Sequence, residues 1–135
     1  MISASDRTGR DDAPSTELRR RWIAIVAPGV GDFYSSGRSG KWCIFKSREN
    51  VDAAWETVRS LVAAGLFPAA KVSTAASGED CFVICAYTTD WSDLTALLVS
   101  RDNLRRAGFT EELGYKRDID TACGVYGPNE WLLRL

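Results

Sequence analysis

The apolar residues of this chain occur in short runs of strand length, separated by two segments in which apolar residues recur at helical spacing. The longest uninterrupted apolar run, residues 81–87, is seven residues long, whereas a membrane-spanning helix needs about 20. No such helix is therefore expected. Because short strands alternate with helices within only 135 residues, the pattern predicts a single α+β domain.

The clearest predicted helix covers residues 48–64. Ser47 is a suitable N-cap residue, and Gly65 is expected to stop the helix. The apolar positions follow helical spacing; they are Val51, Trp55, Val58 and Val62. A second helix is expected after Asp90, where the acidic sequence DWSD suits a helix start. It should end at Gly108, and its predicted apolar side consists of Leu94, Leu97, Leu98 and Leu104.

The predicted strands are residues 41–46, 69–75, 81–88, 114–117 and 122–126. The second and third of these are expected to form a hairpin around a polar turn at residues 77–79. The segment 18–27 fits either a short helix or a strand. The resulting order, β-α-β-β-α-β-β, suggests helices packed on one face of a largely antiparallel sheet.

The first 17 residues are polar and are expected to form a flexible tail, which leaves residues 18–135 as the folded domain. The N-terminal sequence MISASDRTGRDD lacks the apolar segment of a secretory signal, so we expect a cytoplasmic protein. The oligomeric state is left open by the sequence.

The absence of histidine excludes several classes of site. Ser-His-Asp and Cys-His catalysis and His-ligated metals all need an imidazole that this chain lacks. The formal net charge of −1 shows no basic excess of the kind typical of proteins that bind nucleic acid mainly through phosphates. A GxG at residues 29–31 is not continued as a dinucleotide-binding or P-loop motif.

The four cysteines, Cys43, Cys81, Cys85 and Cys123, do not follow a zinc-binding spacing. Cys81 and Cys85 share a predicted strand, where their Cα atoms would lie roughly 13 Å apart, too far for a disulfide. We expect reduced, mostly buried cysteines, no bound metal and no cofactor.

Several residues are candidates for binding or chemistry. Lys71 lies within an apolar strand, with Ser73 on the same face, and partial desolvation would suit this lysine to act as a base; the alternative is a solvated surface lysine. Lys41 neighbours Trp42, which is either a stacking platform for a flat ligand or a core residue.

The remaining candidates are one tryptophan, Trp91, and two cations, Lys116 and Arg117. Trp91 belongs to a helix start and could line a cleft, and Lys116 with Arg117 forms either an anion-binding rim or a charged edge strand.

Four separated strings, GKWCIF, AKVST, VICAYTTDWSD and GYKRDIDTACGVYGPNEW, resemble the basophilic leukaemia-expressed protein family over about residues 20–134. Bacterial members of that family are often labelled phosphothreonine lyase domain proteins. The resemblance implies a fold like that of the cap-binding translation initiation factor 4E, which is a curved antiparallel sheet backed by two helices.

The resemblance implies two functions from different classes. One is non-catalytic binding of a phosphorylated peptide, a nucleotide or an RNA segment on the concave sheet face. For this function the residue patterns, rather than the resemblance, supply the candidate ligand-binding residues, which are Lys41, Trp42, Ser73, Trp91, Lys116 and Arg117. The other is a lyase-like β-elimination of phosphate from phosphothreonine or phosphoserine, with Lys71 as the base. The lyase histidine falls near Cys43 or Ile44, so the general acid is missing, although Lys41 or Lys116 could neutralise part of the phosphate charge. The third hypothesis is that the protein is a protein–protein adaptor.

Overall fold

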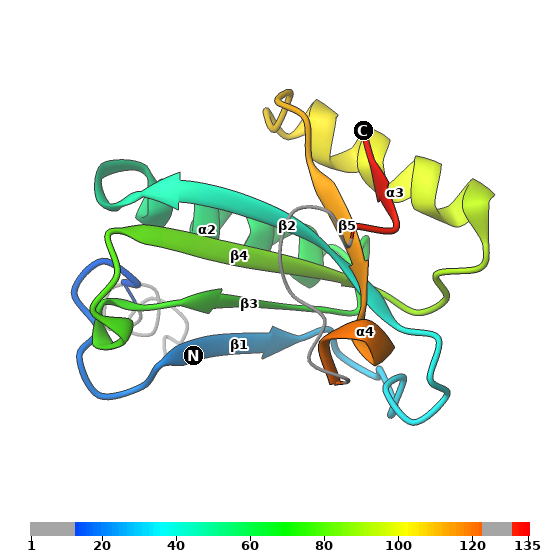
Figure 1. Cartoon of the computed structure of the whole chain (residues 1–135), viewed down its shortest axis with the longest axis horizontal. Coiled ribbons are helices and arrows are strands. Elements are labelled where there is room, and N and C mark those ends of the chain that lie inside the picture. Colours follow the sequence, from blue (N-terminus) through cyan, green and yellow to red (C-terminus); the bar gives the residue numbers. More distant parts are fainter. Residues whose placement is uncertain (1–12, 123–130) are drawn as a thin grey trace.

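The computed structural model describes residues 13–122 and 131–135. Its elements, shown in Figure 1, are, in chain order, β1 (Trp22–Val26), β2 (Gly40–Ser47), α2 (Arg48–Ala63), β3 (Ala69–Ser73), η1 (Ala75–Ser77), β4 (Cys81–Thr88), α3 (Leu94–Arg106), β5 (Gly114–Arg117), α4 (Asp118–Ala122) and β6 (Leu133–Arg134).

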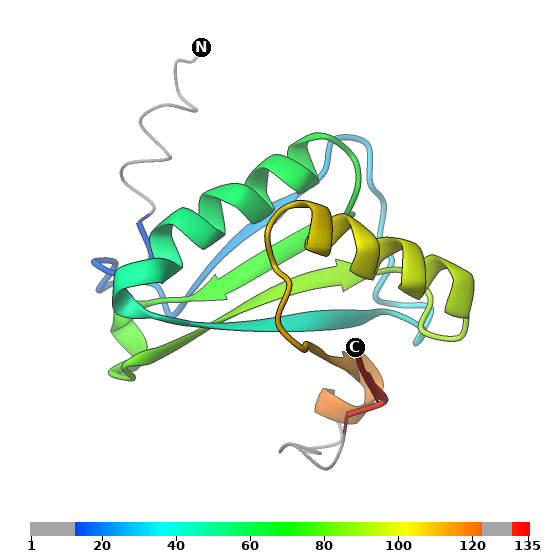
Figure 2. The same ribbon diagram turned by 90° about the horizontal axis from the view of Figure 1, so that it is seen from above.

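The strands form one six-stranded sheet in the order β1-β3-β4-β2-β5-β6, and every pairing is antiparallel. The two longest strands, β2 and β4, lie at its centre and pair over eight residues, from Gly40 opposite Thr88 to Ser47 opposite Cys81. The curved sheet carries α2 and α3 on one side, while the short helix α4 lies on the other (Figure 2). The predicted α+β fold, with two helices backing an antiparallel sheet, is confirmed.

Helix α2 forms where the apolar spacing predicted it. Five residues of one face are buried against the sheet; they are Val51, Ala54, Trp55, Val58 and Val62. Ser47 occupies the N-cap position, but its side chain makes no capping hydrogen bond and instead accepts one from the Asn50 amide at 3.1 Å. Gly65 follows the helix with a φ of 82°, in the left-handed region that favours glycine.

Helix α3 begins and ends as predicted, but its apolar side is narrower than the sequence suggested. The Asp93 carboxylate caps the helix by accepting a hydrogen bond from the backbone N–H of Ala96 at 3.1 Å. Leu97 and Leu104 are buried, whereas Leu94 and Leu98 are exposed. The prediction was wrong for these two residues because only one edge of α3 contacts the sheet.

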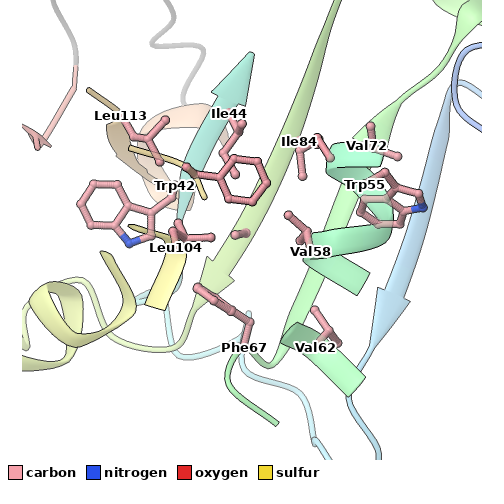
Figure 3. Close-up of a cluster of buried hydrophobic side chains, with 14 of the residues drawn as sticks. Trp42, Ile44, Trp55, Val58, Val62, Phe67, Val72, Ile84, Leu104 and Leu113 are labelled. Atoms are coloured by element: carbon pink, nitrogen blue, oxygen red, sulfur yellow. The ribbon is translucent and has the colours of Figure 1, made fainter. Parts of the chain in front are cut away.

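The core lies between the sheet and the two long helices. Figure 3 shows the side chains of Trp42 and Ile44 from β2 packed with Leu104 and Leu113, while Trp55 and Val58 approach from α2. Burial of this apolar surface is the main stabilising contribution to such a domain.

Two chain segments differ from what the sequence predicted. Residues 18–27, which fitted either a helix or a strand, supply the edge strand β1, paired with β3. The predicted strand 122–126 does not begin at residue 122, which ends the short helix α4; its remaining residues lie outside the described part. Within the expected tail, Ser15 contacts the domain, since its hydroxyl donates a hydrogen bond to Asp52 of α2 at 2.5 Å.

Across residues 13–122 and 131–135, none of the helices has the length and apolar character needed to cross a bilayer.

Alkaline pH is expected to destabilise this fold through Tyr115, whose side chain is fully buried and shares a hydrogen bond with the Thr88 hydroxyl at 2.6 Å. Burial raises the pKa of Tyr115 to about 12 from its ordinary value of 10. Between these two pH values the folded chain keeps a proton that the unfolded chain loses. The stability present below pH 10 should therefore fall as the pH rises towards 12, by about 1.4 kcal/mol per pH unit at most. Urea unfolding at several pH values measures how steeply the free energy of unfolding falls with pH. Tyr115→Phe should make this dependence shallower, and an unchanged dependence in this variant would contradict its assignment to Tyr115.

Candidate functional site

The face of the sheet opposite α2 and α3 carries an unusual group of side chains. Because side chains alternate along a strand, the strand residues that do not enter the helix-covered core point to this face. From the four inner strands they include Lys41, Cys43, Lys71, Cys85, Tyr87 and Lys116. Three lysines from three different strands therefore share one face with two thiols and a tyrosine.

A pocket of about 470 Å³ opens on this face. It is lined by Tyr34, Gly37, Ser39, Lys41, Lys71, Tyr87, Asp118, Ile119 and Thr121. The floor comes from β2, β3 and β4, one wall comes from the loop that precedes β2, and the other comes from α4. The pocket is large enough for a small-molecule ligand.

Lys41 is held at one side of the pocket. Its side chain is largely buried, and its Nζ atom lies 2.7 Å from Asp118 Oδ1 and 3.0 Å from Thr121 Oγ1. Both partners belong to α4, which follows directly after β5 and is thereby positioned over the sheet face. Asp118 also accepts a hydrogen bond from the Ser39 hydroxyl at 2.6 Å. Lys41 therefore has a carboxylate partner, which satisfies the charge of this buried ammonium.

Lys71 lies at the other side of the pocket and has a different environment. Its Nζ atom is 4.0 Å from the ring centroid of Trp22 on the neighbouring edge strand, a cation–π contact. Among the described residues, no carboxylate lies within ion-pair distance of this lysine. Lys71 is half-buried, so its ammonium group is available to a ligand in the pocket.

Lys116 extends the basic group beyond the pocket lining. It lies directly opposite Lys41 in the pairing of β2 with β5, and only 7% of its surface is exposed. Its Nζ atom lies 5.1 Å from the ring centroid of Trp131. The structure thus brings together three of the predicted site residues, Lys41, Lys71 and Lys116.

Aromatic rings also line the pocket, and Tyr87 lies beside Lys41, whose Nζ atom is 5.9 Å from the centroid of its ring. Tyr34 stacks on Phe33, with ring centroids 4.6 Å apart, and meets Tyr87 edge-on at 5.4 Å. Burial raises the pKa of both Tyr34 and Tyr87, so both hydroxyls stay protonated at neutral pH. They can donate or accept hydrogen bonds without adding negative charge to the pocket.

Trp42 does not belong to the site, and its prediction as a ligand platform was wrong. Its side chain is 0% exposed and faces the helices, where its Nε1 atom donates a hydrogen bond to Ser100 Oγ at 2.8 Å. Because Lys41 and Trp42 are adjacent in one strand, they point to opposite faces of the sheet, and only one of the two can reach the pocket.

Three other predicted residues lie apart from the pocket lining. Ser73 is on the correct face, but its hydroxyl accepts a hydrogen bond from the backbone N–H of Val83 at 2.9 Å. Arg117 donates two hydrogen bonds to Asp120, at 2.9 and 2.7 Å, and lies over the ring of Trp91. Trp91 Nε1 in turn donates to the Gly37 carbonyl at 3.2 Å, so this pair supports the loop at the rim rather than the pocket itself.

The sequence reasoning missed Trp22, Tyr34, Tyr87, Asp118 and Thr121. Tyr87 lies two residues after Cys85 in β4, so side-chain alternation along the strand could have assigned it to the same face as that cysteine. Asp118 follows a predicted edge strand in the charged sequence YKRDID, where nothing local indicates that a helix begins. No group of three or more acidic or cysteine side chains within the described ranges is arranged to hold a metal ion.

Comparison with known proteins gives a family and a fold. The sequence model of the family described as Basophilic leukemia-expressed protein Bles03 matches residues 35–119, more than half of the chain. Among solved structures, the chain is similar to C. elegans eIF4E-3 in complex with the 4E-binding protein Mextli and a cap analog. The TM-score is 0.67 at 15% identity, covering 84% of this chain and 68% of that one. A second complex of eIF4E-3 with Mextli gives a TM-score of 0.60 at 15% identity, with 82% and 65% covered. At this identity the likeness shows the fold.

Proposed function

We propose that this chain, which belongs to the Basophilic leukemia-expressed protein Bles03 family, binds a small phosphorylated ligand, a nucleotide, without catalysis on the face of its sheet opposite α2 and α3. The observation that carries this proposal is that Lys41 and Lys71, from different strands, line one pocket together with Tyr34 and Tyr87. Cations that converge from separate strands suit a phosphate group, and aromatic rings suit a base or another flat group. The eIF4E-like fold is compatible with a ligand-binding role.

Lys71 would supply the main free charge for the phosphate. Lys41 already pairs with Asp118 at 2.7 Å, whereas Lys71 contacts only an aromatic ring among the described side chains. A charge-assisted hydrogen bond to phosphate contributes roughly 1.5–3 kcal/mol. Tyr34, which is half exposed, would pack against the base.

Nucleotide binding can be tested by isothermal titration calorimetry with AMP and ATP, and with adenosine as the phosphate-free control. We expect both nucleotides to bind with an affinity that falls as salt rises, and adenosine to bind more weakly. Lys71→Met should weaken nucleotide binding about tenfold or more, which corresponds to about 1.4 kcal/mol. Tryptophan fluorescence provides a second readout, because the ring of Trp22 contacts Lys71.

Lys46→Met is the matched control. Lys46 belongs to the same strand as Lys41 but points to the other face, where its Nζ atom lies 3.3 Å from Glu111. We expect its affinity for nucleotide to stay within twofold of the wild type. Two results would contradict the assignment of the phosphate to Lys71. One is equal affinity for adenosine and AMP, and the other is an equal loss of nucleotide affinity in Lys71→Met and Lys46→Met.

The structure favours binding over elimination of phosphate. Elimination also needs a general acid that protonates the departing phosphate, and the chain has no histidine to supply one. The tyrosine hydroxyls of the pocket have pKa values raised by burial, which makes them poor acids. Incubation with a phosphothreonine peptide separates the two activities: release of phosphate, with loss of the mass of phosphoric acid from the peptide, would show a lyase.

A further inference from the structure

Two cysteines lie side by side on the face of the sheet opposite α2 and α3, next to the lysines. Cys43 of β2 and Cys85 of β4 are direct partners in the antiparallel register, although 42 positions separate them in the sequence. Directly opposite residues in such a pair have Cα atoms about 4.5–5.5 Å apart, and disulfides span Cα separations of about 4.4–6.8 Å. Because both side chains point to the same face, a bond between the two sulfurs needs no change of strand register.

The two thiols differ in chemical character. The neighbouring Cys43 side chain, aided by the charges of Lys71 and Lys41, lowers the pKa of Cys85 against the opposing effect of burial. The neighbouring Cys85, together with burial, raises the pKa of Cys43. The thiolate is the reactive form of cysteine, so Cys85 would react first and Cys43 second.

A hollow on this face reaches Cys43. Cys43 borders a hollow of about 140 Å³ whose lining also includes Phe45, Gly114 and Trp131. Cys85 lies between Cys43 and Lys71 in the sheet, and Lys71 lines the larger pocket. The exposed fractions of Cys43 and Cys85 are only 6% and 4%, which favours a reagent as small as hydrogen peroxide over a bulky disulfide.

We propose that Cys43 and Cys85 form a reversible dithiol–disulfide pair that is oxidised by small hydroperoxides. The Cys85 thiolate attacks one peroxide oxygen and the O–O bond breaks, which yields a sulfenic acid on Cys85 and, after protonation, one water. The Cys43 sulfur then attacks the Cys85 sulfur, the S–O bond breaks, and the departing hydroxide leaves as a second water with the Cys43 proton. Two thiols thus lose two electrons and two protons, while one hydrogen peroxide is reduced to two waters.

The proposal does not depend on nucleotide binding. It requires only the strand register and the surrounding lysines. Cys81 offers a contrast within the same strand, because it is exposed and lies opposite Ser47 rather than another cysteine. Without a neighbouring thiol, its oxidation cannot give an internal disulfide across the β2–β4 pair.

The experiment uses the full chain carrying Cys81→Ser, so that Cys85 is the sole cysteine in the tryptic peptide of residues 72–101. The protein is treated with hydrogen peroxide, alkylated and digested without reduction. We expect this peptide to be cross-linked to that of residues 42–46, and the link to disappear after treatment with dithiothreitol. Peroxide that leaves both peptides separate and alkylated, or that links either of them to Cys123 instead, would overturn the proposal.

Two variants test the order of the steps, with circular dichroism to confirm that each remains folded. In Cys43→Ser, the sulfenic acid on Cys85 has no resolving thiol and should accumulate, so that dimedone labelling of Cys85 rises at least tenfold over the parent. In Cys85→Ser, labelling of Cys43 should stay at least tenfold below that level. Labelling of Cys43 equal to that of Cys85 would contradict the assigned roles. If a serine variant does not fold, the peptide map of the Cys81→Ser protein still decides whether the disulfide forms.

Discussion

Replacing Trp42 with alanine should lower the free energy of unfolding by about 3–5 kcal/mol. The indole is fully buried and meets the ring of Tyr115 edge-on, with centroids 5.1 Å apart. The change removes a large apolar surface, leaves a cavity between the sheet and α3, and deprives Ser100 of its indole donor. Denaturant unfolding measures the loss.

Trp22→Ala is the control for this prediction. Trp22 lies on the edge strand β1 with 40% of its surface exposed, so its removal should cost no more than about 1 kcal/mol. A Trp42→Ala protein that is as stable as the wild type but binds nucleotide more weakly would contradict the assignment of Trp42 to the core. It would indicate that Trp42 contacts the ligand.

The second large effect is expected at Arg101, a fully buried residue of α3. Its guanidinium group donates hydrogen bonds to the backbone oxygens of Leu135, Phe109 and Glu111 at 2.9, 3.0 and 2.5 Å. It thereby ties the segment after α3 and the last residue of the chain to the core. In Arg101→Met, Phe109 and Glu111 lose this donor to their backbone oxygens, whereas the Leu135 oxygen still accepts a hydrogen bond from the Leu113 N–H at 2.7 Å. Each buried acceptor that is left unsatisfied costs about 1–3 kcal/mol, so we expect a loss of about 2 kcal/mol or more.

Arg105→Met provides the comparison, since Arg105 is exposed and lies four residues further along the same helix. Its replacement should change stability by less than about 0.5 kcal/mol. Hydrogen exchange would add a local readout, because the amides of residues 109–113 should exchange faster only in the Arg101 variant. Equal stabilities and equal exchange in both variants would show that the three carbonyls do not depend on Arg101.

Local sequence patterns predicted most of the elements. The apolar spacing of α2 and the residues flanking it placed that helix almost to the residue, and the turn between β3 and β4 predicted their hairpin. The same reasoning failed for Leu94 and Leu98, because helical spacing shows which residues share a side but not how much of that side a neighbouring element covers. It could not decide between helix and strand for β1, whose strand conformation depends on pairing with β3.

The site was predicted only in part, because its residues meet through contacts between elements that local sequence patterns do not show. Alternation along a strand places the adjacent residues Lys41 and Trp42 on opposite faces, but it cannot say which of the two faces the helices. The pairing of Lys41 with Asp118 depends on α4, a short helix that no sequence signal marked.

The sequence by itself thus determined the fold class, the positions of both long helices, the absence of histidine chemistry and the division of each strand into two faces. These properties depend on composition and on periodicities within a few residues. Only the tertiary structure decided which face the helices cover, that Lys41 and Lys71 share a pocket, and that Cys43 lies against Cys85. These depend on the register between strands distant in sequence, which is set by the packing of the whole sheet.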